Sequence, residues 1–133
     1  MENVHTQNNL TGIRLTVAFD VDDTLIIPAV ATGMPSDTPN YPLINVLKWF
    51  QGQGARVIIW SGGGVDYAKT WAEKLALQPC EIRVKEKSDD IDIAFDDCMV
   101  DLGKVNVQVH RYNNSVSRKE WNDHKNYENR TKN

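Results

Sequence analysis

The sequence predicts a single α/β domain built on a mainly parallel sheet of five strands. Short apolar runs alternate with segments of helical periodicity, and this alternation is typical of parallel strands joined by crossover helices. A length of 133 residues suits one domain, and 41% hydrophobic residues are enough for one core. Because crossover helices cover such a sheet on both faces, we expect a three-layer arrangement.

The strands are predicted from apolar runs and the helices from the spacing of apolar residues. Five runs are predicted to be strands, at residues 13–19, 55–60, 80–84, 91–95 and 105–110. Two segments have helical spacing, with Leu43, Val46, Leu47 and Phe50 after Pro42, and then Ala68, Trp71, Ala72 and Leu75. Residues 26–41 combine prolines with small residues and are predicted to form a loop or a short flap.

The polar ends of the chain are predicted to lie outside the core. Residues 1–12 form a polar N-terminal segment, residues 13–111 the core and residues 112–133 a polar tail or helix. Residues 111–133 contain six Lys/Arg and three Asp/Glu and so carry a charge of +3. Because the net charge of the chain is −3, the remaining residues carry −6. An acidic body argues against broad electrostatic binding to nucleic acid, although the tail could contact a phosphate backbone.

Nothing in the sequence predicts a membrane protein or an exported one. No apolar stretch is long enough to cross a bilayer, and residues 1–9 lack the charged and then apolar pattern of a signal peptide. Cys80 and Cys98 are the only cysteines. Two lone thiols without an export signal favour reduced core residues over a disulfide or a metal site. We therefore expect a cytoplasmic protein.

Two carboxylates lie at the end of the first predicted strand. If the chain stays extended through Asp22, the side chains of Asp20 and Asp22 share one face, because side chains alternate along a strand. When two carboxylates lie this near each other, one can act as nucleophile and the other can transfer protons, or both can bind one cation. An acidic turn after a strand is the plainer interpretation, since Asp is common in turns.

Polar residues also follow two later strands. Ser61 and three glycines follow the second strand, and Asp96 and Asp97 end the run at residues 91–95. The carboxyl ends of parallel strands lie at one edge, so these groups are expected to meet Asp20 there. Clustered carboxylates repel one another unless protonated or bridged by a cation, and oxygen ligands suit Mg²⁺. The glycines suit an anion site as well as a flexible turn, but no Lys-Ser/Thr pair follows them, which excludes a P-loop.

Two lysines, Lys85 and Lys87, precede the last acidic strand. An ammonium at this place could offset the charge of an aspartate and a bound phosphate. The acidic residues beside them equally suit a solvated loop, and the sequence places only one of the two lysines in the site.

Together the four segments resemble the motifs of the haloacid dehalogenase-like (HAD) superfamily, across residues 17–97. The run from Asp20 to Leu25 resembles the first motif, and Ser61 after an apolar strand the second. Lys87 or Lys85 would be the third, and Asp96-Asp97 the fourth. The resemblance implies a Rossmann-like three-layer domain, and neither 25–41 nor 62–84 is long enough to hold a cap domain. Asp23 stands where glycine is frequent in the family.

The resemblance implies a Mg²⁺-dependent phosphatase that works through an aspartyl-phosphate intermediate. Asp20 would attack phosphorus, and Asp22 would protonate the leaving oxygen and then activate water. Ser61 and Lys87 complete the expected catalytic set. The expected substrate-binding residues are Thr24, Ser61, Gly62 and Lys85, and the expected Mg²⁺ ligands are Asp20, Asp22, Asp96 and Asp97.

Several alternatives stay open at the level of function. A site without a cap suits phosphates on macromolecules or nucleotides, or else a homo-oligomer that closes over a small phosphorylated substrate. A non-catalytic phospholigand-binding or interaction protein could keep the same site. A receiver-like phosphoacceptor domain also clusters aspartates, but its acceptor would stand on the middle strand, where Ser61 is found here.

Overall fold

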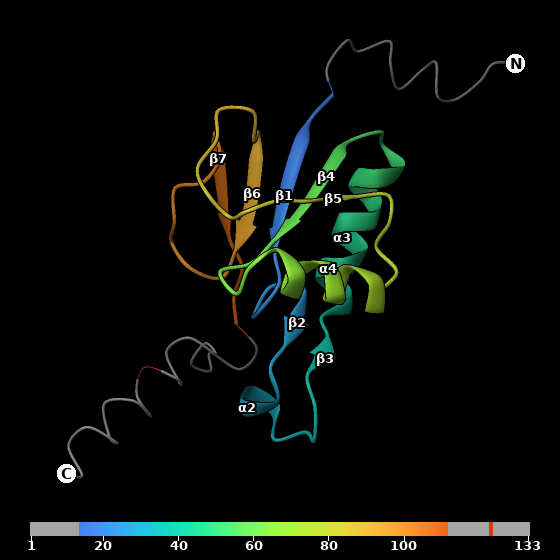
Figure 1. Cartoon of the computed structure of the whole chain (residues 1–133), viewed down its shortest axis with the longest axis vertical. Coiled ribbons are helices and arrows are strands. Elements are labelled where there is room, and N and C mark those ends of the chain that lie inside the picture. Colours follow the sequence, from blue (N-terminus) through green and yellow to red (C-terminus); the bar gives the residue numbers. More distant parts are fainter. Residues whose placement is uncertain (1–13, 112–122, 124–133) are drawn as a thin grey trace, which may run out of the picture.

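Five parallel strands form the centre of the molecule. The computed structural model describes residues 14–111 and Asp123, so the predictions for residues 1–12 and for the rest of the tail lie outside the described residues. The sheet order is β5-β4-β1-β6-β7 (Figure 1). The strands are β1 (Thr16–Asp20), β4 (Arg56–Trp60), β5 (Glu81–Ile82), β6 (Ile93–Asp96) and β7 (Val105–Gln108). The predicted single α/β domain with a parallel five-stranded sheet is confirmed.

Two helices cover one face of this sheet. They are α3 (Tyr41–Gly52) and α4 (Val65–Lys74), and both contribute buried residues to the same apolar cluster as Val17 and Phe19 of β1. The chain passes from β1 through α3 to β4 and through α4 to β5, moving across the sheet in one direction. Right-handed crossovers made in one direction place their helices on one face, which explains the shared cluster.

Loops cover the other face. Ala18, Ile58 and Ala94 point to this side, where Ile91 and Leu102 pack on them from the segments before and after β6. The segment between β5 and β6 crosses the sheet in Figure 1. Within residues 14–111 no helix contributes to this second cluster, so the expected third layer consists of loops. The segments 83–92 and 97–104 lack the apolar periodicity that a crossover helix requires.

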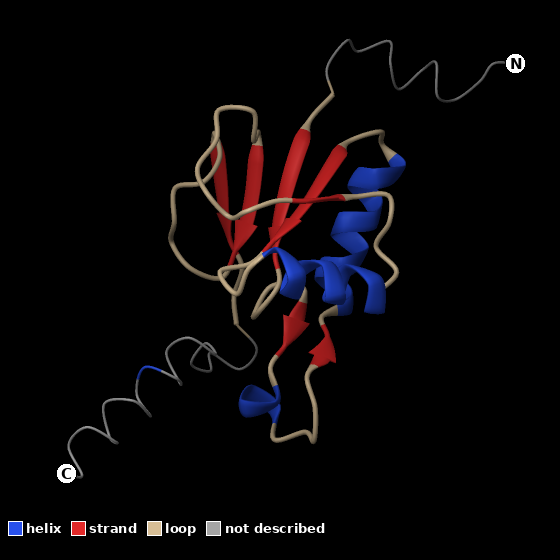
Figure 2. Cartoon of the chain, viewed as in Figure 1, coloured by secondary structure: helices blue, strands red, loops and turns tan. Residues whose placement is uncertain are grey.

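The segment after β1 forms the predicted flap. Strands β2 (Ile26–Ile27) and β3 (Thr38–Pro39) pair antiparallel, with the short helix α2 (Ala29–Thr32) between them. Figure 2 shows this hairpin projecting from the body beyond the carboxyl ends of the strands. It is too small to be a cap domain, as predicted.

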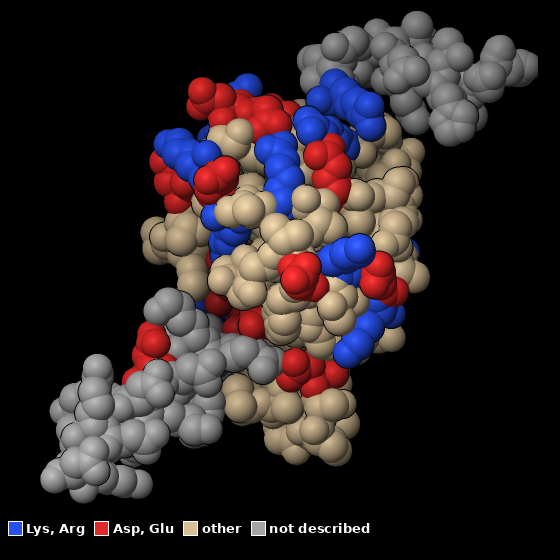
Figure 3. All heavy atoms as spheres, viewed as in Figure 1, with Lys and Arg blue, Asp and Glu red and all other residues tan. Residues whose placement is uncertain are grey.

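Two surface features complete the description. Basic and acidic side chains are interspersed on the face shown in Figure 3, where charge of one sign does not form a broad patch. Strand β7 ends the sheet, and its residues are exposed even where they are apolar, with Val105 54% accessible.

In the part of the chain that the structure describes, no helix has the length and apolar character needed to cross a bilayer.

Candidate active site

The centre of the site is a pair of aspartates on neighbouring strands. Asp20 ends β1 and Asp96 ends β6, and the two strands are paired in register up to Phe19 and Phe95. Both carboxylates are almost completely buried. The parallel register therefore brings together two residues that are 76 positions apart, at the edge where α/β proteins place their ligands.

Lys85 bridges these two carboxylates. Its Nζ lies 3.1 Å from Asp20 Oδ1 and 2.5 Å from Asp96 Oδ2. The contact with Asp20 is a hydrogen bond, whereas buried Asp96 Oδ2 is held by charge and accepts no well-aligned hydrogen bond. An ammonium group between the two side chains shows that a cation fits there.

The charge of this cluster is unbalanced. Burial, together with the neighbouring Asp96, raises the pKa of Asp20 to about 8, and Lys85 offsets only part of this rise. Burial alone would lower the pKa of Lys85, but the two carboxylates outweigh it and raise that pKa above the ordinary lysine value. Lys85 is therefore positively charged, and one more cation would favour the ionised form of Asp20.

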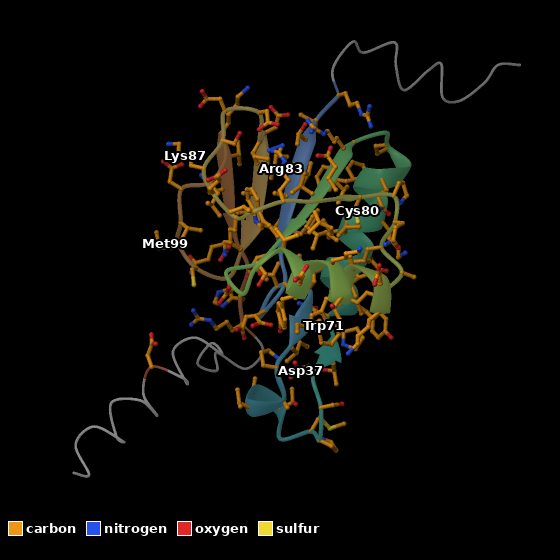
Figure 4. All side chains as sticks on the ribbon, in the orientation of Figure 1. Asp37, Trp71, Cys80, Arg83, Lys87 and Met99 are labelled. Carbon is orange, nitrogen blue, oxygen red and sulfur yellow. The ribbon has the colours of Figure 1, made fainter. Side chains whose placement is uncertain are left out.

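Lys87, which the sequence analysis places in the catalytic set, lies outside this cluster. Its side chain is 62% exposed, and its Nζ lies 2.6 Å from Asp101 Oδ2. Figure 4 shows Lys87 at the outer side of the molecule, near β7. Of the two lysines that the sequence offers for the site, Lys85 contacts Asp20 and Asp96, whereas Lys87 pairs with Asp101.

Ion pairs hold the loop that carries Lys85. Arg83 Nη2 lies 2.5 Å from Asp90 Oδ2, and Arg56 of β4 contacts both Glu81 and Asp90. These contacts join the two ends of the loop to each other and to the sheet. The ammonium group of Lys85 is thus presented by an irregular segment whose ends are fixed.

Asp97 has a different partner from Asp96. Its Oδ2 accepts a hydrogen bond of 2.9 Å from Arg111 Nε, whereas Asp96 faces Lys85. Oxygens of Asp96 and Asp97 and the sulfur of Cys98 lie within 4.8 Å of one another, so this group could hold a metal ion. Burial raises the pKa of Cys98, which keeps the thiol protonated and makes it a poor ligand. The two carboxylates are the better candidates.

A tight turn follows Asp20 and places Asp22 beside α4. The backbone N–H groups of residues 24–26 all donate to the carbonyl of Val21, so the chain does not stay extended through Asp22. Asp23 has φ +66°, a left-handed conformation that Asp adopts more readily than most residues and glycine adopts freely. The phenol of Tyr67 donates a hydrogen bond of 2.6 Å to Asp22 Oδ1.

Thr24 is buried beside Asp20 and supports its carboxylate. Its side chain is fully buried, and its hydroxyl donates to Asp20 Oδ2 over 3.4 Å. The turn carries Thr24 beneath the carboxylate instead of towards solvent. That Thr24 binds substrate stays a prediction from the sequence.

Ser61 and Gly62 lie where β4 ends. Ser61 directly follows Trp60, the residue of β4 paired with Asp20, and its Oγ accepts a hydrogen bond of 2.9 Å from the N–H of Gly63. Gly62 is exposed. Gly64 precedes α4 with φ +106°, a conformation that requires glycine. The predicted polar strand ends therefore occupy one edge of the sheet.

Two residues of the site were not predicted from the sequence. No sequence pattern around Arg111 predicts that its side chain pairs with Asp97. The position of Tyr67 is a weak indication, since Tyr67 lies in the first turn of the helix that follows Ser61. The first turn of such a helix lies at the carboxyl edge of the sheet.

Comparison of the chain with protein family models, with curated proteins and with solved structures finds no match. The fold and the site themselves define the class: an α/β domain whose parallel sheet ends in buried carboxylates around one lysine.

Proposed function

We propose that this protein is a Mg²⁺-dependent phosphatase that hydrolyses a phosphomonoester through an aspartyl-phosphate on Asp20. The observation that carries this proposal is the bridge that Lys85 makes between Asp20 and Asp96. It unites a candidate nucleophile, a second carboxylate for a cation and a charge that can neutralise a phosphate. Covalent phosphoryl transfer requires these three groups within reach of one another.

The buried acids support a divalent cation as the missing charge. Asp20, Asp96 and Asp97 are buried with only Lys85 and Arg111 as cationic partners among the described residues. Asp20 and Asp96, with the backbone carbonyl of Asp22, would hold Mg²⁺, which prefers oxygen ligands and few carboxylates. When bound, the ion would reduce the repulsion between an attacking carboxylate and a phosphate.

The chain supplies a residue for each step of the reaction. A carboxylate oxygen of Asp20 attacks phosphorus while the bond to the leaving oxygen breaks, and Asp22 gives its proton to that oxygen. Asp22 then takes a proton from water, which attacks the phosphorus and releases phosphate and Asp20. Lys85, the Ser61 hydroxyl and the Gly62 N–H hold the phosphoryl oxygens.

Phosphate release from p-nitrophenyl phosphate tests this proposal. We expect turnover with Mg²⁺, none with EDTA, and none in Asp20→Asn, which keeps the shape of the side chain but removes the nucleophile. Asp89→Asn is the control, because Asp89 is exposed on the loop and outside the cluster. Equal activity of Asp20→Asn and the wild type would reject the proposal.

One observation favours a second candidate function, a non-catalytic phospholigand-binding protein. The pKa of Asp20 is raised to about 8, and a carboxyl that keeps its proton is not a nucleophile. Calorimetry that detects binding of phosphorylated ligands without turnover, with Mg²⁺ present, would support this candidate. The phosphorylated substrate, the cytoplasmic location and a homo-oligomer stay predictions from the sequence.

A further inference from the structure

We infer that Tyr67 is a positioning residue that orients the carboxyl of Asp22 for proton transfer to the leaving group. The inference rests on the proposed function and assigns a part of it to α4. It depends on the hydrogen bond from Tyr67 to Asp22 and on the close approach of the Tyr67 ring to Gly63.

The first contact is the hydrogen bond from Tyr67 to Asp22. The phenol oxygen lies 2.6 Å from Asp22 Oδ1, at the short end of the range for O–H···O hydrogen bonds. This hydrogen bond joins two segments that no backbone hydrogen bond connects, the turn after β1 and the first turn of α4. The side chain of Asp22 is therefore fixed from outside its own turn.

The ring of Tyr67 lies close to Gly63. A Cβ atom added to Gly63 would lie 3.3 Å from Tyr67 Cδ2 and 3.4 Å from Ser61 Oγ. The ring therefore lies beside the space that a side chain at residue 63 would need. Ser61 Oγ accepts the N–H of Gly63. A Cβ atom at residue 63 would press on the ring, so glycine at this position allows Tyr67 to reach Asp22.

The geometry assigns different tasks to the two oxygens of Asp22. A protonated carboxyl has one O–H donor, and an oxygen that accepts a phenol hydrogen bond is a poor place for the proton. Oδ1 accepts from Tyr67, and this assigns proton exchange with the leaving oxygen and with water to Oδ2. Tyr67 takes part only by donating this hydrogen bond.

Tyr67→Phe removes one oxygen atom and tests this role. Proton donation matters most for a poor leaving group, because a good one departs without a proton. We expect kcat/KM for phenyl phosphate, which reports the steps through loss of the leaving group, to fall by about tenfold or more in Tyr67→Phe, within the range of general acid catalysis. We expect kcat/KM for p-nitrophenyl phosphate to change by less than about twofold, since that leaving group needs little proton donation. Tyr41→Phe is the matched control, because Tyr41 is 64% exposed at the start of α3.

The outcomes separate the inference from the proposed function. Equal losses of kcat/KM on the two substrates, or no loss on either, in an active and folded Tyr67→Phe would overturn the role of Tyr67 alone. A wild type without turnover that depends on Mg²⁺ and Asp20 would overturn the proposed function and this inference with it. Circular dichroism of each variant shows whether it is folded.

Discussion

Lys85 and Lys87 are two residues apart, yet only Lys85 contacts Asp20. Lys85→Ala removes the bridging charge, and we expect kcat/KM for p-nitrophenyl phosphate to fall by about 100-fold or more, as when an electrostatic stabiliser is lost. Lys87→Ala removes only an exposed ion pair, so its kcat/KM is expected to stay within about twofold of the wild type. Steady-state kinetics of the two variants measure this difference. Similar losses in both would contradict the assignment of Lys85.

The pKa of Asp20 predicts a pH dependence of stability without metal. Between the ordinary pKa of 3.8 and about 8, the folded chain keeps a proton on Asp20 that the unfolded chain has released. The folded state therefore binds more protons, and the free energy of unfolding falls as pH rises through this range. Asp20→Asn cannot titrate, so its stability should fall less steeply.

Urea denaturation in EDTA at pH 5.5, 6.5 and 7.5 measures this effect. The difference in slope between the wild type and Asp20→Asn is at most about 1.4 kcal/mol per pH unit, the value for one proton. Parallel pH profiles of the two proteins would show that Asp20 has an ordinary pKa in the folded state.

At the scale of single residues, the strand ends could be predicted and their partners could not. Asp20, Ser61 and Asp96 follow apolar runs, and parallel strands bring such ends to one edge. Which of the two lysines contacts Asp20 depends on the ion pairs of the loop that carries them, and ion pairs in a loop produce no periodic sequence pattern. Tyr67 reaches Asp22 across two elements, and no local pattern signals that contact.

At the scale of the element, the end of α4 carries an alanine where glycine is usual. Ala76 has φ +54°, its N–H donates to Glu73, and the N–H of Leu77 donates to Ala72. These two bonds form a Schellman motif, whose left-handed position is normally filled by glycine. Ala76 is exposed, so its side chain contributes little packing.

Ala76→Gly is therefore expected to raise the free energy of unfolding by about 0.5–1 kcal/mol, because glycine adopts this conformation without steric cost. Ala76→Val is the opposite control, since a β-branched residue is disfavoured at positive φ. Chemical denaturation of both variants gives the comparison. A destabilised Ala76→Gly would mean that the left-handed position costs the wild type nothing.

The helices and strands themselves were predictable because their apolar spacing decides which face is buried. In α3, Ile44 and Leu47 lie in the core, as a helix with this periodicity requires. Strand β7 shows the limit of this reasoning. Val105 and Val107 alternate as in a half-covered strand, but β7 is at the edge of the sheet and α3 does not extend over it, so both are exposed.

At the scale of the whole molecule, loops take the place of one helical layer. Ile91 and Leu102 close the second face over Ala18 and Ile58, and single apolar residues of this kind carry no pattern that predicts a layer. Gly103 lets the two loops approach each other. A Cβ atom there would lie 2.9 Å from Ile91 Cγ2 and 3.1 Å from the carbonyl oxygen of Ile91.

Gly103→Ala is expected to lower the free energy of unfolding by about 1–3 kcal/mol, the usual cost of overpacking. Gly52 is the matched control, because a Cβ atom at the end of α3 would meet nothing within 4 Å. Gly52→Ala should be neutral or slightly stabilising. Thermal or urea unfolding distinguishes the two, and an unchanged Gly103→Ala would show that the loops do not pack as a layer.

The central claim is that Asp20 becomes phosphorylated at an edge of the sheet where Asp96 and Lys85 supply the surrounding charge. Mass spectrometry of protein quenched in acid during turnover of p-nitrophenyl phosphate tests it most directly, with Asp22→Asn used to slow hydrolysis of the intermediate. We predict one phosphoryl group on the peptide that contains Asp20 when Mg²⁺ is present, and none with EDTA. Steady phosphate release with no phosphorylated peptide, or with the group on another residue, would contradict the account.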